Sequence, residues 1–479
     1  LAVMLVVESG FPWLAGLGIG LAASFTLGGA SEFLVIRRFF RAPRLVLTVA
    51  TLGLSQALAV PALLMPRWWD SKVVSQRIAV PIDAVWDVGP VRLRAEHLAV
   101  LILVPLVLAL VGALLRWTNL GVAIRAAAER PDRASSLGIP VKAVQTLVWA
   151  IAASLAFLAL YLRAGVIGLP VGGGLGFGLL LRALAALMIG RLESLPAVLG
   201  ASVALGMLHQ GIDWNQDTSL VGDAIMALVI IVALLARRIR KERGELELGS
   251  FQAVGEIRRL PKALSRLPEI LVLRFGATIG FAAFLLWLPR WMDTANTLRA
   301  SYLHLVIMVV VSLVVLTGWA GQLSLGQWAF VSIGAVVGAE LTQEWGVDLI
   351  LATLGAGVAG VVASLAVGLP ALRLRGLYLA VTSLAFVVAT TSYVLNPRFF
   401  DWLPSGRIER FPIAGRIDWT SSFAMYHVSL VAMALTFVAV AGIRSSRTGR
   451  VLIAMRENES AAEAYGVDAT RAKLTAFSI

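Results

Sequence analysis

Long apolar runs alternate along this chain with short polar segments. A membrane-spanning helix needs about 20 mostly apolar residues, and runs of this kind predict spans at 12–35, 45–65, 97–115, 144–162, 178–190, 194–210, 220–236, 270–288, 301–317, 328–342, 349–368, 377–395 and 425–442. The run at 178–190 is short, which indicates a half-span or a broken helix. Partial runs occupy both chain ends (1–7 and 472–479), so we expect a window truncated at both ends from a longer protein.

The composition places most of these runs in lipid. The chain of 479 residues is 59% hydrophobic and only 14% charged, whereas a soluble domain is about 45–50% apolar and about 25% charged. A soluble core could not bury so much apolar surface. We therefore predict an all-α, polytopic transmembrane helical bundle with the lipid bilayer as a partner.

Basic residues in the loops indicate the orientation. If 37–44 is cytoplasmic and the loops alternate, the cytoplasmic loops hold 27 Lys and Arg residues and the outer segments hold 12. This excess follows the positive-inside rule and predicts a multi-pass protein of the cytoplasmic (inner) membrane. The net charge of +13 does not indicate nucleic acid as a partner, because the basic residues form no continuous stripe.

A short charged segment occurs twice. The first copy, Leu120–Ile139 (LGVAIRAAAERPDRASSLGI), and the second, within Arg447–Val467 (RTGRVLIAMRENESAAEAYGV), are related by a shift of 328 positions. At this shift the identical pairs are Gly121/Gly449, Ala126/Ala454, Glu129/Glu457, Ala134/Ala462 and Gly138/Gly466. Both copies fall in predicted cytoplasmic loops.

The repeat extends beyond this segment and divides the chain. A long outer loop precedes each copy, at 66–96 and 396–424, so the repeat is parallel and not inverted. The charged stretch 237–269 has no apolar run, as is typical of a cytoplasmic linker. We predict a first unit at 1–236, this linker, and a second unit at 270–479.

The pattern inside the repeat predicts an amphipathic helix. Small and apolar positions recur at helical spacing, while Arg, Glu and Asn take the other face; the small and apolar positions are Ile124, Ala127, Ala134 and Leu137, and Leu452, Met455, Ala462 and Tyr465. Gly138 and Gly466 suit a C-terminal cap with positive φ. One such segment is typical of an ordinary cytoplasmic loop, but two copies at matched topology favour docking of a cytosolic partner.

These residues resemble a known family. ENESAAEAYGV resembles the "EAA…G" coupling helix of ATP-binding cassette (ABC) importer permeases, which docks on the ATPase subunit. TGRVLIAMRENESAAEAYGVDATRAKLTAF, GWAGQLSLGQWAFVSIGAVVGA and LPALRLRGLYLAVTSLAF are similar to one permease subunit of the high-affinity branched-chain amino acid importers, and the first half resembles its partner permease. The chain is thus identified as two such permeases fused, with two parallel repeats of the permease fold.

The resemblance implies which residues contact the ATPases: Arg125, Glu129, Ala134, Gly138, Arg456, Glu457, Asn458, Ala461, Ala462 and Gly466. The first copy departs from the pattern, since Pro131 stands in place of Glu459 and Arg133 in place of Ala461. Pro131 is compatible with the first turn of a helix, but these changes put the strength of docking at the first copy in doubt.

Three polar residues near or inside the spans are candidates for the translocation path. Gln322 and Ser324 belong to Gly318–Gly326, a glycine-rich break that lines a path or simply forms a tight turn between two spans. Arg182 lies in the 178–190 run. A charge inside a span indicates function by default, but Arg182 lies about one turn from the outer end, where it could equally reach the interface.

Catalytic chemistry is not indicated. The chain has no cysteine, and its four histidines lack metal-ligand spacing. The sequence contains no GxxxxGK[ST] motif for binding ATP, no paired carboxylates and no nucleophile–base pattern. We predict no enzymatic activity, no metal site and no cofactor of its own, with ATP used by partner subunits.

The pattern and the resemblance together predict the permease component of an ABC importer. Cytosolic ATPases and an extracytoplasmic substrate-binding protein are the expected partners, and the resemblance implies a branched-chain or related amino acid as substrate. The alternatives are an ion-coupled secondary transporter, which would need acidic residues within the spans, and a channel for small polar solutes, which would need no pair of docking helices.

Overall fold

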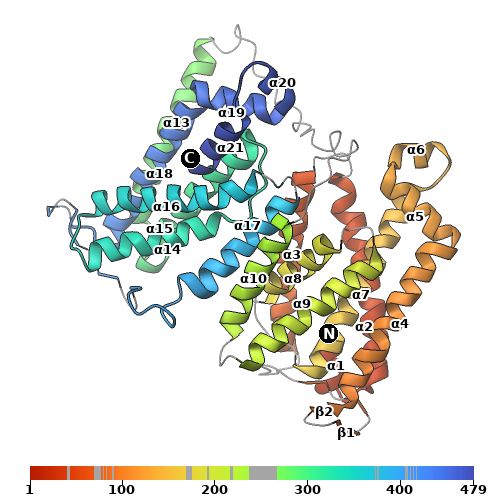
Figure 1. The fold of residues 1–479 in the computed structure, drawn as a ribbon. Coiled ribbons are helices and arrows are strands. Elements are labelled where there is room, and N and C mark those ends of the chain that lie inside the picture. The colour runs from red at the N-terminus through yellow and green to blue at the C-terminus, as the bar shows by residue number, and fades with distance from the viewer. Residues whose placement is uncertain are drawn as a thin grey trace. The chain divides into compact units, whose positions relative to one another are not determined.

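The computed structural model describes residues 1–39, 44–68, 77–78, 80–81, 84–88, 91–168, 175–190, 194–215, 219–236, 267–372, 374, 377–404, 408–409, 411–413, 415–416 and 418–479. This part of the chain is almost entirely helical (Figure 1). Its one small sheet pairs β1 (Val85–Val88) with β2 (Val91–Arg94) in antiparallel register. The prediction of an all-α bundle is confirmed.

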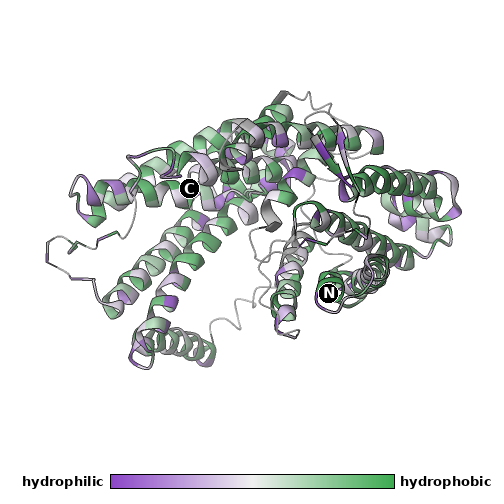
Figure 2. Cartoon of the chain, turned by 90° about the horizontal axis from the view of Figure 1, so that it is seen from below, coloured by the Kyte–Doolittle hydropathy of each residue, from purple (hydrophilic) through white to green (hydrophobic). Residues whose placement is uncertain are grey.

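Each predicted span corresponds to a helix. These helices are α2 (Trp13–Leu34), α3 (Arg44–Trp68), α4 (Ala95–Trp117), α7 (Val141–Val166), α8 (Leu175–Ile189), α9 (Leu195–Asn215), α10 (Ser219–Ala236), α13 (Pro268–Trp287), α14 (Thr294–Leu313), α15 (Gln327–Gln343), α16 (Leu349–Ala371), α17 (Leu377–Ala389) and α18 (Ser422–Ser445). Within the described residues, eight helices are long and apolar enough to cross a membrane. Figure 2 shows apolar residues over much of the helices' length.

The remaining elements are short. They are α1 (Ala2–Val7), α5 (Asn119–Glu129), α6 (Pro131–Ser136), α19 (Arg447–Glu457), α20 (Glu459–Ala464), α21 (Ala469–Ser478), the 3₁₀ turns η1 (Ile36–Phe39) and η2 (Leu288–Arg290), and the π-helices η3 (Val314–Trp319) and η4 (Thr390–Val394). Helix α8 is continuous over 15 residues, about 22 Å at 1.5 Å per residue. This length fits the predicted half-span and not a broken helix.

The chain forms two compact units, Leu1–Phe177 and Gly178–Ile479. In the first unit α2 packs along α7, and a polar cluster joins the two helices at one end. The buried carboxylate of Glu32 accepts hydrogen bonds from Arg37 Nη2 at 3.1 Å and Thr146 Oγ1 at 2.6 Å. A buried carboxylate needs such partners, because burial in an apolar environment disfavours its charge.

The second unit contains a core built from both halves of the sequence. Apolar residues of α8, α9 and α10 interlock with those of α17; they are Leu181, Ala185, Ala186, Met188, Leu205, Met226, Ala227, Ile230, Leu234, Val381, Leu384 and Ala385. Small residues on α8, α10 and α17 let the helices approach closely. Elsewhere in this unit α14 packs on α18 and α15 on α16.

Packing therefore groups the helices differently from the repeat. The predicted boundary at 236 follows the sequence copies, whereas α8, α9 and α10 belong to the same compact unit as the second copy. The predicted linker 237–269 lies outside the described residues except for its last three. The division into 1–236, 237–269 and 270–479 stays a prediction about the sequence repeat.

Candidate functional site: two helix–break–helix segments

The first copy of the repeat forms two helices joined at a break. Helix α5 follows α4 at a sharp turn, where Thr118 Oγ1 accepts a hydrogen bond from the Gly121 backbone N–H at 3.0 Å. A Cβ at Gly121 would clash with the carbonyl oxygens of Leu114 and Leu115, so only glycine fits. The helix ends at Arg130, whose φ of −145° and ψ of 89° break the chain before α6.

The second copy repeats this geometry. Ser446 caps α19 by accepting from the Gly449 N–H at 3.4 Å, and a Cβ at Gly449 would clash with the Ile443 carbonyl oxygen. The break falls at Asn458, with φ −155° and ψ 100°. The two segments thus share their turn, break and helix lengths, although they lie in different compact units.

The two copies start their second helices differently. Asn458 Oδ1 caps α20 by accepting from the Ala461 N–H at 2.9 Å, while Arg130 makes no side-chain cap and Pro131 opens α6 instead. The backbone N–H groups in the first turn of a helix have no acceptor within the helix. Proline lacks this N–H and therefore suits the first turn of α6. This observation supports the compatibility expected for Pro131.

Each segment ends on the predicted glycine cap. Gly138 has φ +85° and Gly466 has φ +83°, the left-handed region that favours glycine. The next residue in each copy, Ile139 or Val467, donates its N–H to the carbonyl of Ala134 or Ala462 at 3.1 Å.

The inner face of each segment packs on the helix that follows. Ala127 and Ala134 are buried against Val141 and Val144 at the start of α7, and Met455 and Ala462 are buried against Ala472 of α21. The predicted candidates Arg125, Glu129, Gly138, Glu457, Asn458 and Gly466 are exposed, whereas Ala134 and Ala462 are buried and Ala461 is half-buried.

Two residues of the predicted apolar face are exposed. Leu137 is 82% exposed and Tyr465 is 91% exposed, whereas the other apolar or small positions of that face are buried or half-buried. The helical period assumed one continuous helix, but the break at Arg130 and Asn458 starts a new helix with a different phase. Both segments consequently present a large apolar side chain to their surroundings at matching positions, Leu137 and Tyr465.

Arg456, one of the residues expected to contact an ATPase, is bonded within the second unit. It is half-buried, and its Nη1 donates a hydrogen bond of 2.6 Å to the carbonyl of Gly318 in the π-helix η3. The left-handed Gly321 leaves room for this side chain, since a Cβ there would lie 2.8 Å from Arg456 Cγ. Arg456 therefore fastens α19 to η3, where Leu452 also packs on Val315 and Leu316.

The glycine-rich stretch continues from η3 as a buried, non-helical connection. Gln322 and Ser324 are both buried. Ser324 Oγ accepts from the Gly326 N–H at 3.1 Å, and Ser383 Oγ of α17 accepts from the Leu325 N–H at 2.9 Å. A hydrogen bond from the backbone of this stretch thus joins it to α17. Gln322 and Ser324 both lie inside the second unit.

Arg182, the third candidate, belongs to a cluster of three side chains. Its Nη2 donates to Asp223 Oδ1 of α10 at 2.6 Å, and His209 Nε2 of α9 lies 3.6 Å from the same oxygen. The sequence prediction missed Asp223 and His209. Each lies at helical spacing from buried apolar residues of its own helix, Asp223 from Met226, Ala227 and Ile230. A charged residue in such a position was the feature of the sequence that could have identified them.

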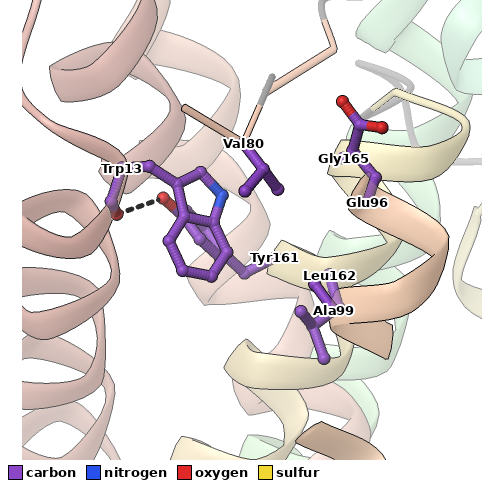
Figure 3. Close-up of a pocket in the computed structure, with 7 residues that line it drawn as sticks. All are labelled: Trp13, Val80, Glu96, Ala99, Tyr161, Leu162 and Gly165. Carbon is purple, nitrogen blue, oxygen red and sulfur yellow. Dashed lines mark hydrogen bonds between the residues drawn. The ribbon is translucent and has the colours of Figure 1, made fainter. Parts of the chain in front are cut away.

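The cavity found in the first unit includes none of these residues and is too small for a substrate. This cavity of about 10 Å³ is lined by Trp13, Val80, Glu96, Ala99, Tyr161, Leu162 and Gly165 (Figure 3), close to the lower limit for one water molecule. Tyr161 donates its hydroxyl to the Trp13 carbonyl there, at 2.8 Å. Nor do the described residues contain a group of metal-binding side chains.

Comparison with known proteins identifies the family. The sequence profile of the branched-chain amino acid transport system / permease component family matches residues 1–234 and 297–479. Two relatives, the high-affinity branched-chain amino acid transport system permease proteins LivM of Salmonella typhimurium and Escherichia coli, are each 29% identical over 235 residues. These alignments cover 43% of this chain and 55% of each relative.

The chain spans about half the length of the curated relatives it matches. No solved structure matches the chain. The family profile nevertheless covers most of the sequence, in one segment from each half. This chain therefore belongs to the branched-chain amino acid transport permease family, and it carries two segments of that family in one polypeptide.

Proposed function

We propose that this chain is the transmembrane component of an ABC importer for branched-chain or related amino acids in the cytoplasmic membrane. Separate ATPase subunits dock on the two helix–break–helix segments, α5–α6 and α19–α20, and a binding protein delivers the substrate from outside. The observation that carries this proposal is the matched geometry of the two segments, with Leu137 and Tyr465 exposed at equivalent positions.

Exposed apolar side chains at matched positions suit a protein partner. Exposure of a large apolar side chain to water is unfavourable. Such a side chain, here called an anchor, contributes much of the binding free energy of many interfaces when it fills a pocket on the partner. In both segments the side facing the chain is packed, and the same segments carry exposed charged residues, Arg125, Glu129 and Glu457 among them. An apolar centre with a polar rim is the usual anatomy of an interface.

Arg456 gives the second segment a route to the transmembrane helices. Movement of α19 would be transmitted to η3 through the hydrogen bond from Arg456 to the Gly318 carbonyl and through the packing of Leu452 on η3. A π-helix contains a wider turn than an α-helix and often marks functional positions. In our proposal η3 and the connection carrying Gln322 and Ser324 respond to the ATPase, and this connection forms part of the translocation path.

The ion-coupled alternative finds less support. Such a transporter needs a carboxylate that can gain and lose an ion within a span. Glu32 is buried near the end of α2 but is bonded to Arg37 and Thr146, and Asp223 is paired with Arg182. Both of these carboxylates have cationic partners, so the alternative would have to rest on Glu340 of α15, whose Oε2 is buried without a hydrogen-bond partner among the described residues.

Co-purification with ATPases of this transporter class tests the docking. We expect Leu137→Asp and Tyr465→Asp each to weaken ATPase association by about 30-fold or more, as for loss of a hot-spot side chain worth at least about 2 kcal/mol. Uptake of leucine into vesicles should fall in parallel. The matched control is Arg471→Gln, whose side chain is 88% exposed just beyond the second segment. Full association and uptake in both Asp variants would contradict the docking role.

A further inference from the structure

The Arg182–Asp223–His209 cluster lies at one end of the core that α8, α9 and α10 form with α17. Arg182 follows Leu181 of that core, His209 lies one turn beyond Leu205, and Asp223 lies one turn before Met226 and Ala227. Helix α9 runs opposite to α8 and α10, and the three helices bring these charged residues to the same end of the core. By the loop charges this is the outer end, because α8 and α10 begin there and α9 ends there.

The ion pair at this place contributes little to stability. A pair that keeps contact with solvent is typically worth no more than about 1 kcal/mol. The side chains of Arg182 and Asp223 keep 35% and 31% of their surface exposed. A small solute can therefore reach both charges.

The helix opposite the cluster is irregular. Helix α10 packs on the π-helix η4 as well as on α17, and η4 contains Thr390, Thr391 and Ser392 in its turn. The π-helix η4 also forms the end of the predicted span 377–395, just before the predicted outer loop 396–424. The charged cluster and this hydroxyl-bearing π-helix therefore belong to one end of the same compact unit.

We propose that Arg182 and Asp223 form a binding site for the zwitterionic head of an amino acid. The guanidinium of Arg182 binds the α-carboxylate, because a planar donor fork matches a carboxylate. The carboxylate of Asp223 binds the α-ammonium, and His209 orients it from the other side. In the empty protein Arg182 and Asp223 pair with each other. When the substrate binds, this ion pair is replaced by two others, Arg182 with the α-carboxylate and Asp223 with the α-ammonium.

This inference rests on the proposed function, since it names the part of an amino-acid substrate that the chain recognises. It predicts that both charges of the substrate are required. An analogue of leucine that lacks either charge would break the Arg182–Asp223 pair and leave one of the two residues without a new partner. The aliphatic side chain plays no part in this selection.

Equilibrium binding of radiolabelled leucine to the purified full chain in lipid nanodiscs tests the inference without the binding protein. We expect binding that unlabelled leucine displaces, and that 4-methylpentanoate (no ammonium) and 3-methylbutylamine (no carboxylate) do not displace. Arg182→Gln and Asp223→Asn should each weaken binding at least about 10-fold, because each removes a charge-assisted hydrogen bond. Arg182→Lys should retain part of the affinity.

The double variant Arg182→Met/Asp223→Leu separates binding from structure. It replaces the ion pair by apolar side chains, so its thermal unfolding should stay close to that of the wild type while leucine binding is lost. Leucine binding equal to wild type in the double variant, or none in the wild-type chain, would overturn the inference. Uptake by the wild-type chain assembled with its ATPases and binding protein tests the proposed function separately, so the two can fail independently.

Discussion

At the scale of single residues, the two docking segments share two glycines and a large exposed apolar side chain at matching positions. Gly121 and Gly449 permit the sharp turn from a transmembrane helix, and Gly138 and Gly466 end the segment with positive φ. The sequence identified these glycines because they match between the copies. It could not identify the exposure of the apolar side chain near the end of each segment, since a hydropathy pattern treats every apolar residue as a candidate for burial.

Substituting the turn glycine should disturb the segment. We expect Gly121→Ala to destabilise the protein by about 1–3 kcal/mol, because the new Cβ would clash with the carbonyl oxygens of Leu114 and Leu115. The matched control is Gly112→Ala in α4, where nothing lies within 4 Å of an added Cβ; it should be neutral or slightly stabilising. Thermal unfolding in detergent measures both, and equal unfolding temperatures would contradict the close approach.

At the scale of elements, the two docking segments share their backbone but differ in how they are held. Glu459 of α20 accepts a hydrogen bond from Lys473 Nζ of α21 at 2.6 Å, and Arg456 reaches η3. At the positions of Glu459 and Arg456 the first copy has Pro131 and Ala128, whose side chains offer neither an acceptor nor a donor. The second segment is therefore more firmly joined to its unit by polar contacts.

A double-mutant cycle on Glu459 and Lys473 measures this difference. Glu459→Gln and Lys473→Met should each destabilise the chain, and the double variant should cost less than the sum, with a coupling of about 0.5–1 kcal/mol for a partly exposed ion pair. The coupling should shrink at high salt, because ions screen such pairs. Additive effects at low salt would show that the pair does not join α20 to α21.

At the scale of the whole molecule, the two sequence units share a core. Because α8, α9 and α10 interlock with α17, the first half of the chain contributes helices to the second compact unit. The linker 237–269 is thus not needed to hold these helices together once the core has formed. We therefore expect the two halves to assemble as separate polypeptides.

Cutting the chain tests this arrangement. Residues 1–250 and 251–479, co-expressed as separate chains, should co-purify from membranes through the shared core. Ala227→Trp, at a fully buried position in that core, should prevent assembly because the site has no room for an indole. The neighbouring Leu228→Trp is the control, since Leu228 is 58% exposed. Separate purification of the wild-type halves would contradict the shared core.

The sequence by itself determined the positions of the apolar helices, the repeat and the glycine caps. Apolar runs have to be helical in lipid, because every backbone polar group must be bonded within the segment, and a duplicated motif stays visible at a constant shift. These features depend on local composition and need no knowledge of which helices are neighbours.

Only the tertiary structure decided which charges meet and which side chains are exposed. Arg182 finds Asp223 on another helix, Arg456 finds the Gly318 carbonyl far along the chain, and the break within each docking segment turns its large apolar side chain outward. Each outcome depends on the packing of separate helices or on a change of phase at a break. A helical period read along one continuous segment contains neither kind of information.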